Sequence, residues 1–320
     1  EALFGRLTAG GKVLAEVAAG RLALNVLDAR FRLTERLLFP PPELAIPGGL
    51  LAVGGDLAPE RLLLAYRHGI FPWFSPGEPI LWWSPDPRCV LFPDRLRISR
   101  SMRRLIRSRI FTITFDTCFA DVMTACQEER RGREGTWITA GMKAAYVRLH
   151  EMGLAHSVEV WREDCLAGGL YGVSLGRIFF GESMFSRVAN ASKAALIALV
   201  QQLAARDFQL IDCQIQSEHL QKLGAEMIPR DGFLRMLRRS LARESLCGSW
   251  RFFTAGDGAT LPLPGRTGDH GTGRQHPPRH FSAEGQFSPG MSFNLTASRR
   301  RAASPYFVAG PSSGRSGRDH

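Results

Sequence analysis

The chain has 320 residues, of which 44% are hydrophobic and 22% charged, a composition typical of a globular protein with a sizeable core. Its formal net charge of +11 favours a polyanionic partner, although a basic charge alone does not identify one. No stretch approaches about eighteen uninterrupted apolar residues, so we expect no membrane span.

The two ends of the chain differ in composition from its middle. Residues 1–36 carry charges among their apolar positions, which is atypical of a secretory signal and predicts an extension of unknown role. Residues 255–320 contain 11 Gly, 7 Pro and 8 Ser, with eight Arg against four acidic residues. Such a segment buries too little apolar surface to fold alone. It predicts a disordered tail that either adds loose affinity for RNA or has no function.

Residues 37–97 form a predicted small, aromatic-rich N-terminal domain. A helix is expected over residues 59–68, with Pro59 in its first turn and Gly69 as its stop. The stretch "FPWFSPGEPILWWSPDP", residues 71–87, then holds five aromatic rings and five prolines. Because proline restricts the backbone, this composition predicts aromatic faces that are held stiffly in place.

A run of basic residues follows in "RLRISRSMRRLIRSR", residues 95–109. Its arginines recur at three- and four-residue intervals, so several share one face of a predicted helix. A solvated helix face is the ordinary interpretation. Contact with phosphates is the functional alternative, because the run lacks acidic residues and follows aromatic rings that could stack on bases. The arginines concerned are Arg97, Arg100, Arg103, Arg104 and Arg107.

Residues 98–254 alternate between helix and strand patterns. A helix is predicted after the N-cap Thr139, and strand-like pieces such as "HSVEVW" and "RIFFGESMF" follow it. Asn190 opens another helix, "FQLIDCQI" returns as a strand, and "DGFLRMLRRSLARE" closes the region as a helix. Antiparallel strands, a helix, a strand and a further helix predict an α+β domain.

Three polar side chains near these strands are candidates for chemistry. In "LIDCQIQ", strand alternation points Asp212 and Gln214 to one face of a sheet and Cys213 to the other. A carboxylate beside a carboxamide suits a hydrogen-bond donor, but such a pair also ties down loops at strand ends. In "FFGESMFS", Glu182 follows an apolar strand, where it either faces a pocket or is paired structurally.

Several strings occur in one order between Pro47 and Pro229, over half of the chain. They include "GIFPWFSPGEPILWWSPDPR", "EGTWIT", "GGLYGV", "FFGESMFSRVANASKAAL" and "LIDCQ". Together they resemble the bacterial leucyl/phenylalanyl-tRNA–protein transferase family. The resemblance implies an α+β fold in which a GCN5-type acetyltransferase-like domain follows a small family-specific N-terminal domain.

The same resemblance implies an activity. Such an enzyme moves Leu, Phe or Met from aminoacyl-tRNA to the α-amino group of proteins that begin with Arg or Lys, tagging them for degradation. We expect a cytoplasmic monomer that needs no metal and no cofactor. The six cysteines form no CxxC pair and lack histidines at metal-ligand spacing, and no R/QxxGxG/A loop for acetyl-CoA follows a strand.

The resemblance implies catalytic roles for three residues. Asp212 and Gln214 would hold the acceptor amine. Gln214 would orient it, and we hypothesise that Asp212 supplies negative charge and receives the proton, directly or through Gln214 or water. Glu182 would fix the terminal ribose or the aminoacyl group.

Binding roles follow from the resemblance as well. Trp73 and Trp137 would grip the terminal adenosine of the tRNA, with Tyr66 and Tyr146 close by. The arginine run would hold the acceptor stem through phosphate contacts. An apolar pocket would take the aminoacyl side chain, although core packing is an equally good account of each residue that lines it. These residues are Leu170, Phe179, Met184 and Ile211.

Two alternatives stay open on the sequence alone. One is another acyltransferase of the same fold, using acetyl-CoA or building peptidoglycan bridges from aminoacyl-tRNA. The missing glycine loop disfavours acetyl-CoA. The other is a non-catalytic RNA-binding module, which would leave "GESMF" and the same-face pair Asp212 and Gln214 without an explanation.

Overall fold

The computed structural model describes residues 31–131 and 136–253. The chain divides into two units, Glu1–Gly265 and Arg266–His320, and all described residues belong to the first. Most of the predicted extension at residues 1–36 and the entire predicted tail at residues 255–320 lie outside the described residues. Their assignment therefore stays a prediction.

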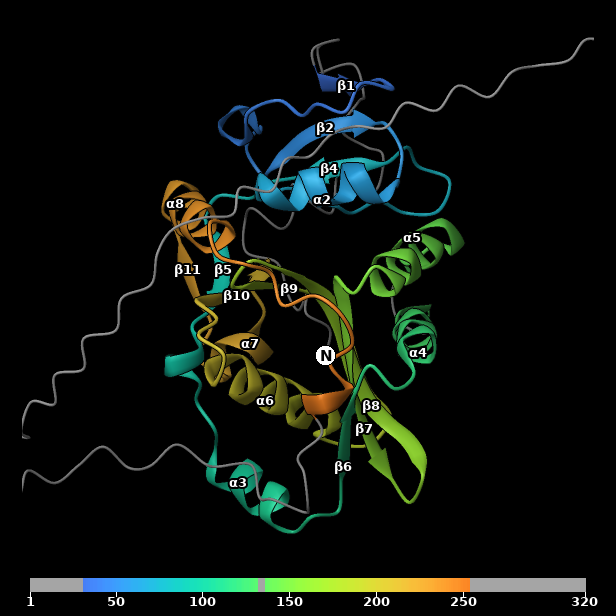
Figure 1. The fold of residues 1–320 in the computed structure, drawn as a ribbon, viewed down its shortest axis with the longest axis vertical. Coiled ribbons are helices and arrows are strands. Elements are labelled where there is room, and N and C mark those ends of the chain that lie inside the picture. Colours follow the sequence, from blue (N-terminus) through green and yellow to red (C-terminus); the bar gives the residue numbers. More distant parts are fainter. Residues whose placement is uncertain (1–30, 132–135, 254–320) are drawn as a thin grey trace, which may run out of the picture. The chain divides into compact units, whose positions relative to one another are not determined.

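A four-stranded sheet in the order β1-β2-β4-β3 contains the first strands of the described chain (Figure 1). β2 pairs antiparallel with β4, and β1 and β3 lie at the edges. As the sequence predicts, α2 begins with proline and stops before Gly69, whose φ of +70° favours glycine. The elements are β1 (Arg32–Leu33), β2 (Leu50–Gly54), α2 (Pro59–Arg67), β3 (Phe71–Pro72) and β4 (Leu81–Trp83).

A second, seven-stranded sheet has the order β11-β5-β10-β9-β8-β7-β6. From β6 to β9 the strands form an antiparallel meander, and α6 then leads to β10, which pairs parallel with β9 and antiparallel with β5. The strands are β5 (Arg88–Leu91), β6 (Thr112–Phe115), β7 (Ala155–Arg162), β8 (Cys165–Leu175), β9 (Ile178–Ser186), β10 (Leu210–Gln214) and β11 (Glu226–Ile228). This mixed sheet confirms the predicted α+β class.

Six helices accompany the seven-stranded sheet in the described part of the chain, and three short 3-10 helices complete the elements. The α-helices are α3 (Arg100–Arg107), α4 (Phe119–Arg131), α5 (Ala140–Glu151), α6 (Ala191–Ala204), α7 (Glu218–Lys222) and α8 (Arg230–Leu241). The 3-10 helices are η3 (Pro42–Leu44), η4 (Pro93–Arg95) and η5 (Arg251–Phe253).

Apolar side chains on the two faces of the larger sheet belong to different clusters. Along β9, Ile178 and Phe180 pack with residues of α2, α4, α5 and α8, whereas Phe179 between them packs with residues of α6 and α7. We call these two sides the α5 face and the α6 face. Cover on both faces buries β7 continuously from Ala155 to Val160.

The starts of two helices test the capping predictions. Thr139 caps α5 as expected, since its side-chain oxygen accepts a hydrogen bond from the backbone N–H of Met142 at 3.2 Å. Asn190 precedes α6 as expected but has a left-handed φ of +71° and makes no side-chain cap bond. Its Oδ1 instead accepts a hydrogen bond from Lys193 Nζ at 3.1 Å.

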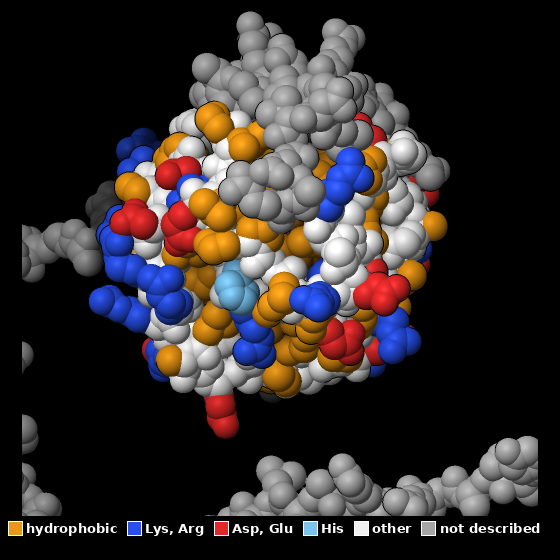
Figure 2. All heavy atoms as spheres, turned by 90° about the horizontal axis from the view of Figure 1, so that it is seen from above, with side chains coloured by type: hydrophobic (Ala, Val, Ile, Leu, Met, Phe, Trp, Pro, Cys, Tyr) orange, Lys and Arg blue, Asp and Glu red, His pale blue; other side chains and the backbone are white. Residues whose placement is uncertain are grey.

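The surface seen in Figure 2 mixes charges of both signs with hydrophobic side chains. Exposed large apolar residues of the described chain include Leu37, Leu38 and Leu44, which precede the first central strand of the small sheet. Within residues 31–131 and 136–253, none of the helices has the length and apolar character needed to cross a bilayer.

Candidate active site

A buried carboxyl on β9, that of Glu182, meets tyrosines from two helices. The hydroxyl of Tyr66 on α2 donates a hydrogen bond to Glu182 Oε1 at 2.7 Å, and that of Tyr146 on α5 donates to Oε2 at 3.0 Å. The two hydroxyls also form a hydrogen bond with each other. Both tyrosines are fully buried, and Glu182 is 4% exposed. Three distant segments of the chain therefore converge on one carboxyl group.

Local sequence patterns explain this convergence. In α5, Met142, Ala145, Tyr146 and Leu149 are buried at the spacing of one helix face, which directs Tyr146 toward the sheet. In β9, Glu182 comes two residues after Phe180, so both side chains point to the α5 face. The carboxyl thus occupies a position that an apolar side chain would ordinarily fill.

The three hydrogen-bonded pairs among Tyr66, Tyr146 and Glu182 require three hydrogens. The two hydroxyls supply only two, because an ionised carboxylate is an acceptor only. A protonated Glu182 supplies the third. In that neutral form the bond between Tyr146 and Oε2 runs the other way: Oε2–H donates to Tyr146, Tyr146 donates to Tyr66, and Tyr66 donates to Oε1. The geometry therefore favours the neutral acid.

Burial raises the pKa of Glu182 to about 7, which agrees with that proton count. Hydrogen bonds from Tyr66 and Tyr146 lower the pKa but do not outweigh the loss of solvation. The negative charge of Asp212 raises it further, and the positive charge of Arg88 lowers it. Glu182 consequently changes its charge in the neutral pH range.

Asp212, at the centre of β10, forms a buried ion pair with Arg88 at the start of β5. Arg88 Nε donates to Asp212 Oδ1 at 2.8 Å, and Nη2 donates to Oδ2 at 2.7 Å, so the contact is bidentate. Neither residue is more than 1% exposed. The guanidinium lies over the rings of Phe71 and Phe233, at 4.8 and 4.7 Å from their centroids. Both Asp212 oxygens are thus occupied within the protein.

Gln214 ends β10 between these two carboxyl groups. Its backbone N–H donates to Asp212 Oδ1 at 3.0 Å, and its side-chain Nε2 donates to Glu182 Oε1 at 3.4 Å. The predicted same-face placement of Asp212 and Gln214 is confirmed, because Cys213 packs in the cluster of the α6 face. A register shift between residues 212 and 214 and a φ of +56° at Gln214 depart from regular strand geometry.

A small apolar pocket is lined in part by Glu182. It occurs where β10 stops pairing with β9, since their register ends at Asp212 and Phe180 while β9 continues to Ser186. All four residues predicted to form the aminoacyl pocket line it, together with Glu182, Cys213 and residues of α6. These four are Leu170, Phe179, Met184 and Ile211.

The two indoles predicted to grip adenosine are placed differently from each other. Trp73 is half-buried and packs against Trp83, with ring centroids 5.6 Å apart. The indole N–H of Trp83 donates to the backbone carbonyl of Trp73 at 2.7 Å, which fixes the chain there. Trp137 is buried just before α5. Both belong to the α5 side of the sheet, where the tyrosines and Glu182 lie.

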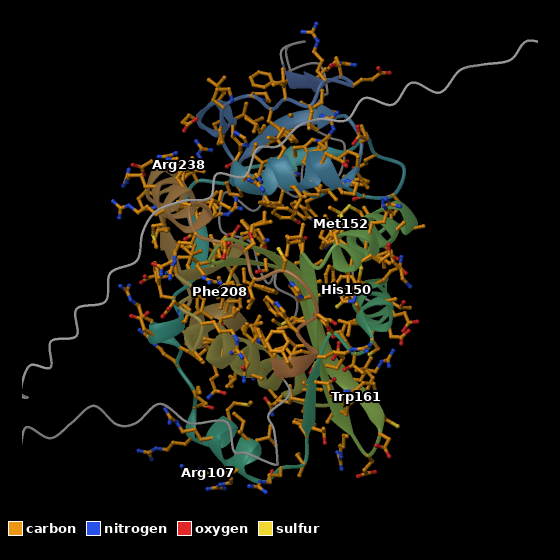
Figure 3. All side chains as sticks on the ribbon, viewed as in Figure 1. Arg107, His150, Met152, Trp161, Phe208 and Arg238 are labelled. Carbon is orange, nitrogen blue, oxygen red and sulfur yellow. The ribbon has the colours of Figure 1, made fainter. Side chains whose placement is uncertain are left out.

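The arginine run lies apart from this cluster. Met102 anchors α3 in the apolar cluster of the α6 face, whereas Tyr66 and Tyr146 belong to the other face. Figure 3 shows Arg107 on α3 at the end of the drawn fold away from α2. The exposed side chains of this run include Arg97, Arg100, Arg104 and Arg107. The structure thus does not bring these arginines to Glu182.

Sequence reasoning missed Arg88. An arginine at the start of the otherwise apolar strand "RCVL" was the available signal, because a buried arginine requires a charged or strongly hydrogen-bonding partner. Nothing in the local pattern names that partner, Asp212, which lies 124 residues further along the chain. Metal-ligand clusters of three or more His, Cys, Asp or Glu are not found among the described residues.

The fold and the site together define a class: an α+β enzyme with an apolar pocket where its sheet opens, lined in part by a buried glutamate whose pKa is raised to about 7. Residues 90–238 match the leucyl/phenylalanyl-tRNA protein transferase family, and residues 55–86 match the N-terminal domain of the same family. The chain therefore belongs to this family of transferases. Its fold class is the predicted α+β one, in which a family-specific N-terminal domain precedes the larger domain.

Relatives match about two thirds of the chain. The chain is 58% identical over 221 residues to a leucyl/phenylalanyl-tRNA–protein transferase of Syntrophobacter fumaroxidans, covering 69% of this chain and 94% of that protein. It is 60% identical over 215 residues to the one from Syntrophus aciditrophicus, covering 67% and 90%. With the one from Stutzerimonas stutzeri it shares 56% identity over 217 residues, covering 67% and 96%.

Two solved structures are similar over part of the chain. An aminoglycoside acetyltransferase from an uncultured soil sample, bound to sisomicin, has a TM-score of 0.28 and 12% identity over 42% of this chain and 88% of its own. L-PGS from Bacillus licheniformis has a TM-score of 0.29 and 12% identity over 51% of each chain. At such scores the likeness carries no argument.

Proposed function

We propose that the enzyme transfers Leu, Phe or Met from aminoacyl-tRNA to the α-amino group of proteins that begin with Arg or Lys, which tags them for degradation. The observation that carries this proposal is the apolar pocket lined by Leu170, Phe179, Met184 and Ile211, to whose lining Glu182 also belongs. Its apolar lining suits a side chain that is not branched at Cβ, such as that of Leu, Met or Phe, and Glu182 provides a polar residue beside that lining.

The chemistry requires few catalytic groups. The ester bond to the tRNA is already activated, so amide formation is downhill. An α-amino group has a pKa of about 7.7–8.0, so a fraction of it is uncharged at neutral pH. Alignment of amine and ester by the protein supplies much of the acceleration. No metal and no cofactor is required for this step.

Specific roles in the proposed reaction fall to residues on both sides of Glu182. Trp73 and Trp137 stack on the terminal adenosine, near Tyr66 and Tyr146, whose hydroxyls hold Glu182. Asp212, Gln214 and Glu182 form the catalytic group. The acceptor stem of the tRNA is held by phosphate contacts from the arginine run Arg97, Arg100, Arg103, Arg104 and Arg107.

The proposal extends to the organisation of the protein. Residues 37–97 form the small N-terminal domain and residues 98–254 the catalytic domain. The change of sheet between β4 and β5 supports two domains but favours a boundary at residues 84–87, because β5 already pairs in the seven-stranded sheet. The protein acts as a monomer in the cytoplasm.

Transfer of label tests this function. Purified full-length protein is incubated with tRNA carrying radiolabelled Phe and with reporter proteins that differ only in their first residue. Label in reporters that start with Arg or Lys, and none in those that start with Met or Glu, is the expected result. Label in no reporter, with tRNA still bound, would instead support a non-catalytic RNA-binding module. Label in muropeptides would support a peptidoglycan-bridging acyltransferase.

A further inference from the structure

We propose that Arg88 is a positioning residue of the transfer reaction: it immobilises Asp212 and, through it, Gln214, so that Glu182 is the group that exchanges protons with the reacting amine. This inference rests on the proposed function. It also changes the role of Asp212, which the sequence assigns as a proton acceptor.

The bidentate contact with Arg88 keeps the Asp212 carboxylate buried and paired, away from an incoming substrate. Both oxygens accept charge-assisted hydrogen bonds from the guanidinium, at 2.8 and 2.7 Å, and Asp212 has no exposed surface. Asp212 is also absent from the lining of the pocket, whereas Glu182 is part of it. An ammonium group could reach Asp212 only by breaking a buried ion pair, which is strongly unfavourable.

Asp212, held in place by Arg88, in turn fixes the backbone of Gln214. The same Oδ1 that binds Arg88 Nε accepts the backbone N–H of Gln214 at 3.0 Å. That bond holds Gln214 in its left-handed conformation, with a φ of +56°, and aims its side-chain amide at Glu182 Oε1. The chain of contacts therefore runs from Arg88 to the group that would orient the incoming amine.

Glu182 is the carboxyl-bearing residue in the lining of the pocket. Its ionised form takes one proton from the acceptor ammonium, and the neutral amine nitrogen then attacks the carbonyl carbon of the aminoacyl ester. As the new C–N bond forms and the ester C–O bond breaks, the second amine proton passes to the departing ribose oxygen. The tRNA leaves with a free hydroxyl, and Glu182 releases the first proton to solvent.

Charged and titratable groups face Glu182 from several elements. They are Tyr66 of α2, Tyr146 of α5, Tyr171 of β8, Asp212 of β10 and Arg88 of β5. Arg88 is the only cation named among them, and its charge favours the ionised form of Glu182, while Asp212 disfavours it. Removing Arg88 therefore leaves the Asp212 charge unopposed and raises the pKa of Glu182. Neutralising Asp212 lowers it.

The test compares Arg88→Met, Arg88→Lys and Asp212→Asn in the full-length protein. Arg61→Met is the control, because Arg61 of α2 is also a buried arginine paired with an aspartate, the exposed Asp56 of the loop before that helix. Single-turnover transfer of Phe to an Arg-starting peptide gives the rate, and tRNA binding is measured separately. The titration of Glu182 is followed by carbon NMR of labelled glutamate, with the Glu182→Gln spectrum as the assignment reference.

Arg88→Met is expected to lower the single-turnover rate at least about tenfold with tRNA affinity unchanged, and to move the Glu182 midpoint to higher pH. Asp212→Asn is expected to move it to lower pH. Arg88→Lys keeps the charge but not the bidentate grip, so the midpoint stays near that of the wild type while the rate stays reduced. Arg61→Met is expected to change neither the single-turnover rate nor the titration midpoint of Glu182.

A folded Arg88→Met enzyme with a wild-type rate, or with an unmoved Glu182 midpoint, would overturn the inference. If Arg88→Met does not fold, the lysine variant decides, since a wild-type rate in Arg88→Lys also overturns it. Failure of the proposed function gives a different result, namely no transfer by the wild-type protein itself. In that case the NMR midpoints of Glu182 still test the electrostatic link to Arg88.

Discussion

Tyr66 and Glu182 are 116 residues apart in the chain, yet the hydroxyl of the tyrosine lies 2.7 Å from Oε1 of the carboxyl. This bond joins α2, which accompanies the small sheet, to the strand that borders the apolar pocket. The small domain therefore contributes directly to the environment that sets the charge of Glu182.

The raised pKa of Glu182 predicts how stability depends on pH. Below a pH of about 4.5 the carboxyl is protonated in both folded and unfolded chains. As the pH rises to about 7, the unfolded chain loses this proton first, so the folded state is progressively destabilised. The difference between pKa values of 4.5 and about 7 corresponds to about 3 kcal/mol. Glu182→Gln removes this loss.

Urea unfolding of the wild type and Glu182→Gln at pH 4.5 and pH 8 measures the effect. The free energy of unfolding of the variant, relative to the wild type, should be higher at pH 8 by about 3 kcal/mol. Other titrating groups cancel in this comparison. A relative stability that is the same at both pH values would mean that Glu182 ionises normally in the folded protein.

Removing one tyrosine hydroxyl should raise the pKa of the Glu182 carboxyl. Tyr66→Phe deletes a donor that lowers the pKa of Glu182, so the pKa of Glu182 rises. The loss of a buried hydrogen bond lowers the free energy of unfolding by about 1–2 kcal/mol. NMR titration and urea unfolding check the two effects. A fall in the Glu182 midpoint would contradict the assigned direction of the bond.

The sequence predicts what depends on local pattern. The cap at Thr139, the proline start of α2 and the shared face of Asp212 and Gln214 follow from periodicity and turn chemistry. The ion pair of Arg88 and Asp212 does not, because its partners come from strands 124 residues apart. The register shift at Gln214 likewise depends on the neighbouring strand β5.

The pocket is a second feature that local sequence patterns could not predict. Its four predicted residues come from the family resemblance, and each of them also packs in or against the cluster of the α6 face. Composition alone could not separate a pocket wall from core. The separation arises where β10 stops pairing with β9, and that is a property of the assembled sheet.

Pocket size should control the choice of amino acid. Met184→Ala removes a wall of the pocket, so the smaller Leu side chain loses more contact than Phe does. We expect kcat/KM for Leu-tRNA to fall about tenfold relative to Phe-tRNA, which corresponds to one or two methylene groups. Met227→Ala is the control, since Met227 packs in the same apolar cluster but does not line the pocket. Equal losses with both donors would argue against this pocket as the aminoacyl site.

Stacking by Trp73 should appear in tRNA affinity. Trp73→Ala is expected to weaken binding of aminoacyl-tRNA by about 1–3 kcal/mol. Trp73→Phe should weaken it less, because the smaller ring still stacks on a base. Trp161→Ala serves as the control, because this half-buried indole of β7 lies away from α2 in Figure 3. Binding titrations at fixed salt measure the difference. Equal affinities of the Trp73→Ala and Trp161→Ala variants would remove Trp73 from the nucleotide site.

The last prediction concerns the arginine run, which lies on the other face of the sheet from Glu182. If α3 holds phosphates, Arg104→Glu with Arg107→Glu should weaken tRNA binding and reduce the slope of log affinity against log salt by about 1–2. The matched control is Arg238→Glu with Arg239→Glu on α8, where two exposed arginines receive the same charge change. Figure 3 shows Arg107 and Arg238 at different ends of the fold.

These two double variants separate two courses for the tRNA. A loss confined to the α3 variant means that the acceptor stem extends past the sheet to the α6 face. A loss confined to the α8 variant means that the stem stays on the α5 face, because α8 packs there and its Phe233 contacts Arg88. Since both variants carry the same change in net charge, a general electrostatic effect would weaken binding equally in the two and would assign phosphate contacts to neither helix.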